Sequence, residues 1–371
     1  MERSSMASFS TLPLDLTKEI LYRTPAESLV RAKATCKQWN DLIKDKRFIY
    51  EHWRRSPERF LRADQTVQIL DLVTRTRSDS PIPDELQLSI SNAMAMVHCD
   101  GLMLCVWSDK EYFMFHNIAL WNPLTRNFNV VEHRLARESH RFLKGDNFGI
   151  GYDVNKPRGN YKILMFSANH YCEAVVEIYE CMSKSWRTIV DSKVDWEAYP
   201  WDHGVSVVGN MYWLVKKKTI NYIVAFDFSV ETFKDIFFCH HLPYDNNYLG
   251  CFDGDKLSLL HQNQNYPSPI EVWVSSNLAV GNVTFAKYFS VSSSDFPEFC
   301  YLTFWAHPVY CIAKHERIIA WYTVFSTCLI VCEIDEGGVS NRCLTSKHYW
   351  DDCIGTFNCG YIYKPSLVPL P

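Results

Sequence analysis

The chain has 371 residues, of which 47% are hydrophobic and 22% charged, so extensive disorder is excluded and two or three domains are expected. Aromatic residues reach 15%, which favours β-rich packing because flat side chains suit pleated surfaces. No apolar run is long enough for a membrane helix, and residues 1–10 lack the apolar core of a signal peptide. We therefore expect the nucleus or cytoplasm as the location, with the 14 cysteines reduced, and no membrane partner.

The charge is divided unevenly along the chain. Residues 11–55 carry ten Lys/Arg against six Asp/Glu, a net charge of +4, whereas residues 56–371 carry a net charge of −8. A basic module before an acidic body favours docking of the module on an acidic protein partner by electrostatic steering. A solvated helical surface would give the same pattern. Because the body has no basic stripe, nucleic acid is not expected as a partner.

The first apolar segment, Leu12 to Arg23, predicts a helix with Pro13 in its first turn, where a missing N–H costs nothing. At about 100° per residue, its aliphatic side chains cover an arc of about 160°, wider than the stripe of about 100° that one packing surface requires. The helix is therefore expected to cover two surfaces. The residues of the arc are Leu14, Leu16, Ile20 and Leu21.

Two further helices are expected before residue 55. Thr24 to Glu27 has the pattern of a capping box, with the Thr24 hydroxyl accepting the N–H of Glu27 and Pro25 at the first helical position. The second helix then carries Leu29 and Val30, and the third an apolar stripe of Cys36, Trp39, Leu42 and Ile43.

The third helix leaves the role of its tryptophan open, because Trp39 suits either an interface anchor or a core position. Three helices in so short a module bury little surface, and such small domains are marginally stable. The surplus apolar surface therefore predicts a docking element that a partner completes.

Together these residues resemble the F-box, and they are most similar to the sequences of its plant branch. The matching positions are Leu12-Pro13, Asp15-Leu16, Glu19-Ile20-Leu21, Arg23, Pro25, Ser28-Leu29, Arg31, Cys36-Lys37-Gln38-Trp39, Leu42-Ile43 and Phe48. The resemblance implies docking on the acidic Skp-type adaptor of SCF-type cullin–RING ubiquitin ligases and, through it, on the cullin. The adaptor-binding residues it implies are Leu12, Pro13, Leu16, Ile20, Leu21, Pro25, Leu29, Val30, Cys36 and Trp39.

The rest of the chain is expected to be a linker over 56–90 and an all-β domain over 91–371. Polar residues, serines and prolines break the pattern in the linker, although residues 65–73 alternate like a first strand. Short apolar runs separated by turns then predict hairpins. These are Phe148–Tyr152 with Tyr161–Phe166, Gly204–Val208 with Met211–Val215, and Leu249–Phe252 with Leu257–Leu260.

A repeat of two aromatic residues seven positions apart runs through the β domain, and its anchors lie 58, 47 and 47 residues apart. A period near 50 with hairpins throughout predicts propeller blades, and an irregular β-sandwich is the alternative. The units resemble the second hairpin of kelch repeats, but without the diglycine, so the number of blades and the closure of the ring stay open. The anchoring pairs are Trp121/Phe128, Tyr179/Trp186 and Phe226/Phe233, with a fainter copy at Trp273.

As a whole, the β domain resembles the F-box-associated domain, type 1, of plant F-box proteins. The residues that carry this resemblance are Cys99-Asp100-Gly101-Leu102, Trp121-Asn122-Pro123, Gly149-Ile150-Gly151-Tyr152-Asp153, Tyr161-Lys162-Ile163-Leu164, Ser185-Trp186-Arg187 and Tyr363-Lys364-Pro365-Ser366-Leu367. The expected fold class is α+β and multidomain: a flexible N-terminus (1–10), a small three-helix F-box (11–55), the linker, and a large propeller-like, kelch-like domain.

Two functions of different class are compatible with this organisation. The first is the substrate-recognition subunit of an SCF-type ligase, whose β domain binds a protein target for ubiquitination. The alternative is a β-propeller that binds, or even turns over, a small ligand or glycan, with the helices as an oligomerisation cap. No P-loop, GxSxG or HExxH motif appears, so no enzyme, catalytic residue, metal or cofactor is predicted. The target-binding residues are not predicted beyond three candidate loops: 132–146, 191–202 and 290–299.

Overall fold

The computed structural model describes most of the chain, and the account below is confined to that part. The described residues are 12–63, 67–71, 76–80, 93–108, 116–132, 146–168, 175–189, 194–198, 204–217, 220–236, 246–263, 269–278, 283–292, 309–313, 317–324, 328–335, 337–347 and 360–371. The N-terminal residues 1–10, expected to be flexible, lie outside it. Most of each of the three candidate target loops lies outside it as well.

Four helices open the described chain: α1 (Leu14–Arg23), α2 (Ala26–Ala32), α3 (Lys37–Lys44) and α4 (Lys46–Arg55). The expectation of three helices is therefore corrected to four. The additional helix, α4, begins because the Asp45 carboxylate accepts the N–H of Phe48 at 2.9 Å and so satisfies a free donor of the first turn. α4 buries Phe48, Ile49 and His52.

The capping box expected at Thr24 is wrong. Pro25, not Thr24, is the residue that caps α2, and no side chain accepts the free N–H groups there. The residue before a proline is driven into extended backbone, and Thr24 accordingly has φ −81° and ψ 130°. Its hydroxyl turns back to donate to the Ile20 carbonyl at 2.8 Å, so Thr24 ends α1 instead of starting α2.

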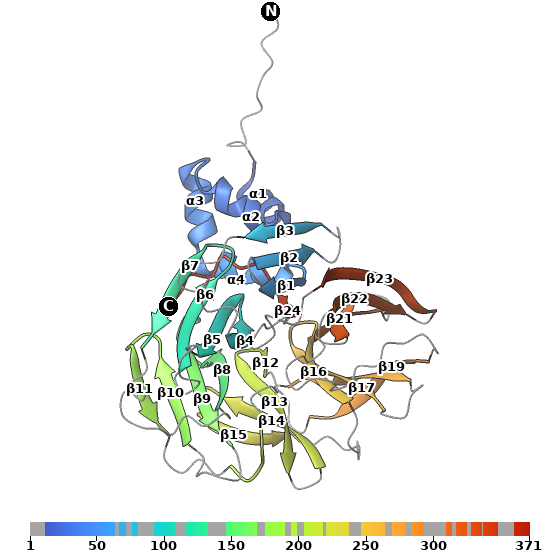
Figure 1. Cartoon of the computed structure of the whole chain (residues 1–371). Helices are drawn as coiled ribbons and strands as arrows, with labels where there is room; N and C mark the ends of the chain where they lie inside the picture. The colour runs from blue at the N-terminus through green and yellow to red at the C-terminus, as the bar shows by residue number, and fades with distance from the viewer. Residues whose placement is uncertain are drawn as a thin grey trace, which may run out of the picture.

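Six four-stranded antiparallel sheets follow and form a ring, with the helices beside the first blade (Figure 1). The domain is therefore a six-bladed β-propeller, which excludes the sandwich. In chain order the strands are β1 (Arg59–Ala63), β2 (Val67–Asp71), β3 (Arg77–Ser80), β4 (Ala93–Cys99), β5 (Leu102–Ser108), β6 (His116–Asn122), β7 (Asn127–Val131), β8 (Asp146–Tyr152), β9 (Tyr161–Ser167), β10 (Val175–Glu180), β11 (Ser185–Thr188), β12 (Val205–Val207), β13 (Asn210–Lys217), β14 (Ile220–Asp227), β15 (Thr232–Ile236), β16 (Asn246–Phe252), β17 (Lys256–Gln262), β18 (Ile270–Ser275), β19 (Phe285–Val291), β20 (Val309–Ala313), β21 (Arg317–Val324), β22 (Cys328–Asp335), β23 (Gly338–Lys347) and β24 (Gly360–Tyr363).

The ring is closed by the two ends of the propeller sequence. β24 pairs antiparallel with β1, with Arg59 opposite Tyr363, so the last strand completes the blade that β1, β2 and β3 begin. Residues 56–90, expected as a linker, therefore supply three strands of the first blade. Their weak alternation hid this role, because the partner strand lies about 300 residues away.

The three predicted hairpins are confirmed as β8–β9, β12–β13 and β16–β17. The aromatic repeat also has a structural basis, since its members face each other across the third and fourth strands of successive blades. Trp121 lies opposite Phe128, Tyr179 opposite Trp186, and Phe226 opposite Phe233. Such cross-strand aromatic pairs stabilise the outer hairpin of a blade.

Candidate functional site

A group of exposed aliphatic residues, here called the α1 ledge, lies at the start of α1 and along one side of it: Leu12, Leu14, Leu16 and Ile20. Their exposed fractions are 36%, 49%, 54% and 46% respectively. The opposite face of the same helix is enclosed, because Thr17 and Leu21 are buried. The two-sided helix expected from the apolar arc is therefore present, with one side packed and the other open.

The ten expected adaptor-binding residues fall into three groups. Leu12, Pro13, Leu16, Ile20, Pro25 and Cys36 are exposed, and Val30 and Trp39 are half-buried against the core. Leu21 and Leu29 retain only 1% and 0% exposure. The expectation that these two contact a partner is corrected, because they hold α1 and α2 in the core and offer no surface.

Cys36 differs from its expected place on the apolar stripe of α3. It is the residue that caps this helix, and its sulfur accepts the N–H of Trp39 at 3.5 Å. Ile43, seven residues further on, takes the fully buried position. The exposed thiol of Cys36 therefore sits at the start of α3, on the outside of the helical module.

The helical module is fixed to the propeller by a buried polar chain, here called the clasp. The Tyr161 hydroxyl of β9 donates to the Asp100 carboxylate at 2.9 Å and lies 3.2 Å from the Tyr50 hydroxyl of α4. Because the Tyr161 hydroxyl proton is engaged in the hydrogen bond to Asp100, the Tyr50 hydroxyl is the donor in its contact with Tyr161. The Arg158 guanidinium lies 4.7 Å from the centre of the Tyr50 ring. Burial raises the pKa of Asp100 to about 6, against the opposing effect of Arg158.

An ion pair adds to this connection, and a hydrogen bond fixes α4 within the helical module. Arg59 of β1 forms ion pairs with Glu27 of α2 and, at 3.3 Å, with Asp71 of β2. The His52 ring of α4 donates from Nε2 to the Thr24 carbonyl at 2.8 Å, and burial lowers its pKa, so the ring is neutral. The core of the helices continues into that of the blades, since Leu29, Ile43 and Phe48 belong to the same buried cluster as the propeller strands.

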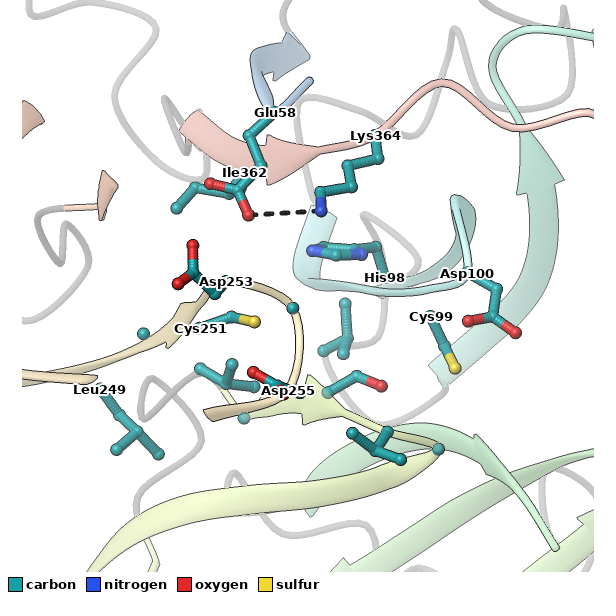
Figure 2. Close-up of a pocket in the computed structure, with 18 of the residues that line it drawn as sticks. Glu58, His98, Cys99, Asp100, Leu249, Cys251, Asp253, Asp255, Ile362 and Lys364 are labelled. Carbon is teal, nitrogen blue, oxygen red and sulfur yellow. Dashed lines mark ion pairs between the residues drawn. The ribbon is translucent and has the colours of Figure 1, made fainter. Parts of the chain in front are cut away.

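A second candidate site is a cavity of about 320 Å³ beside α4, here called the axial pocket. Its walls come from α4, from the ends of β1 and β24, and from the turns that join β4 to β5, β12 to β13 and β16 to β17. Figure 2 shows Glu58 and Lys364 on one side, joined by an ion pair of 3.7 Å, and Asp253 and Asp255 across from them. This volume is in the range of pockets that hold a small ligand or one large side chain.

The sequence did not predict the axial pocket. The sequence identifies Leu249–Phe252 with Leu257–Leu260 only as a hairpin, and Tyr363-Lys364-Pro365 only as part of a family motif. Nothing local shows that Lys364 and Glu58 meet, since their neighbours pair only when β24 joins β1. Pairing across the whole propeller is needed to form this site.

The described residues contain no group of three or more His, Cys, Asp or Glu side chains placed to hold a metal ion. No described helix combines the length and the apolar character that a bilayer crossing requires.

The fold and the two sites define a class of protein: a helical docking module fixed to a six-bladed propeller. Comparison with known families specifies it further. Residues 9–51 match the F-box domain, and residues 58–370 match the F-box associated beta propeller domain. The chain belongs to the family of F-box proteins that carry this propeller.

Relatives in Arabidopsis thaliana extend over the whole chain. Putative F-box only protein 15 is 42% identical over 98% of both chains. F-box/WD-40 repeat-containing protein 1 is 35% identical over 98% of this chain and 90% of its own. Among solved structures, TolB from Acinetobacter baumannii has a TM-score of 0.43 and 12% identity, covering 81% of this chain and 68% of its own. That likeness is too distant to bear on function.

Proposed function

We propose that this protein is the substrate-recognition subunit of an SCF-type cullin–RING ubiquitin ligase. Its F-box would dock on the Skp-type adaptor and, through it, on the cullin, and its propeller would bind a protein target. The observation that carries the proposal is the α1 ledge, which leaves aliphatic side chains in water on a module that matches the F-box. Exposed apolar patches of this kind mark protein interaction sites.

The charge of the module supports the same partner. Residues 11–55 carry a net charge of +4, which suits an acidic adaptor and speeds encounter more than it strengthens the final complex. The clasp also supports a role in ubiquitin transfer to a bound target. A target held by the propeller would keep a fixed position relative to the F-box, so ubiquitin transfer would profit from effective concentration.

In this role the chain needs no catalytic step of its own, and it would act in the nucleus or cytoplasm, where the ligase machinery is found. The kelch-like character of the blades belongs to the proposal too. It is supported by the aromatic pairs that recur in the outer hairpins.

The test is a calorimetric titration of the full chain with a purified Skp-type adaptor, which measures the affinity. Leu16→Asp combined with Ile20→Asp should weaken binding by about 100-fold or more, because each change places a charge in a dry apolar contact. Both side chains are exposed, so the fold should tolerate the substitutions.

The matched control places the same charges on the propeller, at Val130→Asp and Met182→Asp. These residues are 57% and 70% exposed and lie on β7 and in the β10–β11 turn of the propeller. The control should bind the adaptor like the unchanged chain. Absence of adaptor binding by the unchanged chain, or full binding by the α1 variant, would reject the proposal.

A further inference from the structure

We propose that the axial pocket receives a basic side chain, lysine or arginine, which projects from an apolar segment of the target protein. The inference rests on the proposed function, because it names the chemistry of the target that the propeller would bind. Four observations support it: the charge of the pocket, an unused polar group in its wall, an aromatic face, and an apolar rim outside it.

The first observation is an excess of negative charge at one end of the pocket. Glu58, Asp253 and Asp255 line this end, and Lys364 is the cation that faces them. Arg54 and Arg158 also border the pocket. The guanidinium of Arg54 is held by Glu51 of the same helix at 2.8 Å, and that of Arg158 lies 4.7 Å from the centre of the Tyr50 ring, on the side of Asp100. Figure 2 shows the carboxylates of Glu58 and Asp253 turned towards the same space.

Burial makes the charge of Glu58 costly in the empty pocket. The side chain of Glu58 is only 21% exposed, and desolvation raises its pKa in spite of Lys364. A second cation would lower that cost, because the carboxylates outnumber the ammonium group that is present. The pocket therefore favours a positively charged occupant over a neutral or acidic one.

The second observation is His98, whose ring extends into the pocket below Lys364 in Figure 2. Its Nδ1 atom is buried and has no hydrogen-bond partner among the described residues. Burial and the nearby Lys364 lower the pKa of the ring to about 4, so the ring is neutral and one of its nitrogens can accept a hydrogen bond. A buried polar group without a partner is costly, and an occupant with N–H donors would satisfy it.

The third observation is the Trp53 ring of α4, which also lines the pocket. The Lys364 ammonium already lies 5.7 Å from its centre, so this face accepts a cation. Since Trp53 belongs to α4 of the helical module and Asp253 to the propeller, an occupant of the pocket would contact both modules at once.

The fourth observation decides between a free amine and a protein. Val208, in the pocket wall, is 48% exposed, and Val154 and Val230 nearby are 47% and 58% exposed. The Val154 N–H donates to the Ser229 hydroxyl at 3.1 Å, which places Val154 beside Val230. The Tyr152 N–H donates to the Gly209 carbonyl, which brings the turn of Val208 next to the segment of Val154.

These valines, here called the valine rim, lie outside the volume that a small amine would fill. Val208 also adopts φ 49°, a left-handed conformation that β-branched residues avoid, and such strain gathers at functional sites. Exposed apolar residues beside a pocket that carries charged groups are the arrangement of a protein interface with a central anchor. The occupant is therefore a side chain of a protein, with apolar neighbours that cover the rim.

The experiment measures fluorescence anisotropy of labelled peptides on the full chain. Three short peptides of the form Gly-Leu-Ser-X-Leu-Gly carry lysine, norleucine or glutamate at X. The lysine peptide should bind about tenfold more tightly than the norleucine peptide, since a charge-assisted contact is gained. The glutamate peptide should bind most weakly.

Glu58→Gln combined with Asp253→Asn should abolish the preference for lysine. The matched control, Asp195→Asn with Asp235→Asn, neutralises two exposed carboxylates around Lys217 and should retain it. Val208→Ser should weaken the lysine and norleucine peptides alike. Equal affinity for the three peptides, or no binding of any of them, would overturn the proposal.

Two further measurements separate the alternatives. Free n-butylamine should compete only at far higher concentration than the lysine peptide, and equal potency would overturn the assignment to a protein. The adaptor titration is repeated on the same preparation. If adaptor binding persists while the peptide preference is absent, this inference falls and the proposed function stands; the opposite result rejects the function alone.

Discussion

The helices α1 and α4 are both ten residues long, yet they use their apolar residues in opposite ways. α1 leaves Leu16 and Ile20 in water, whereas Phe48 and Ile49 of α4 are buried in the core that continues from the helices into the blades. The difference shows that one module carries two interfaces. The apolar face of α4 is covered within the chain, and the exposed side of α1 is open, as the proposed docking on an adaptor requires.

The largest expected effect separates the two faces of α1. Leu21→Ala should lower the free energy of unfolding by about 3 kcal/mol, because it leaves a cavity in the core. Leu16→Ala is the matched control, because it makes the same substitution at an exposed position of the same helix. It should change the free energy of unfolding by less than about 0.5 kcal/mol. Urea denaturation followed by tryptophan fluorescence measures both values, and equal losses would contradict the two-sided helix.

The next effect concerns the clasp and depends on pH. Asp100 has a folded pKa of about 6, raised above its ordinary value of 3.8, so the folded state binds the proton more tightly than the unfolded state. The contribution of Asp100 to stability is therefore full below about pH 4 and is lost as the pH rises through 6.

Asp100→Asn removes this titration. Between pH 4 and 7.5, the unchanged chain should lose up to about 3 kcal/mol of stability relative to the variant. Denaturation curves of both chains at several pH values give the difference. A difference that is independent of pH would show that Asp100 is not buried in the clasp.

The smallest effect tests the hydrogen bond that α4 contributes to the clasp. Tyr50→Phe should cost about 1 kcal/mol, because it leaves the Tyr161 hydroxyl without its donor. Tyr22→Phe is the control: the Tyr22 ring stacks on Phe48 at 4.8 Å, and that contact survives the loss of the hydroxyl. Equal melting temperatures for the two variants would argue against the clasp.

The sequence predicted what depends on local pattern. The apolar arc of α1 predicted a helix with two surfaces to cover, and the short apolar runs Leu249–Phe252 and Leu257–Leu260 predicted a hairpin that is confirmed. The aromatic spacing found the blades because each pair spans a single hairpin. These features can be predicted because each is formed by residues that lie close together in the sequence.

What the sequence did not predict depends on distant pairing. The first blade was taken for a linker because β1 acquires its partner β24 only when the ring closes. The axial pocket was missed for the same reason. α4 had a local signal, the capping residue Asp45, but its buried residues Phe48, Ile49 and His52 stand among charged ones and gave no clear stripe.

The contrast between α1 and α4 is tested most directly by amide hydrogen exchange on the full chain, with and without the Skp-type adaptor. The account predicts that exchange in residues 12–30 slows when the adaptor is added, because the α1 ledge becomes covered. Exchange in residues 46–63 should not change, because the propeller already protects them. Unchanged exchange in residues 12–30, or faster exchange in 46–63, would contradict the account.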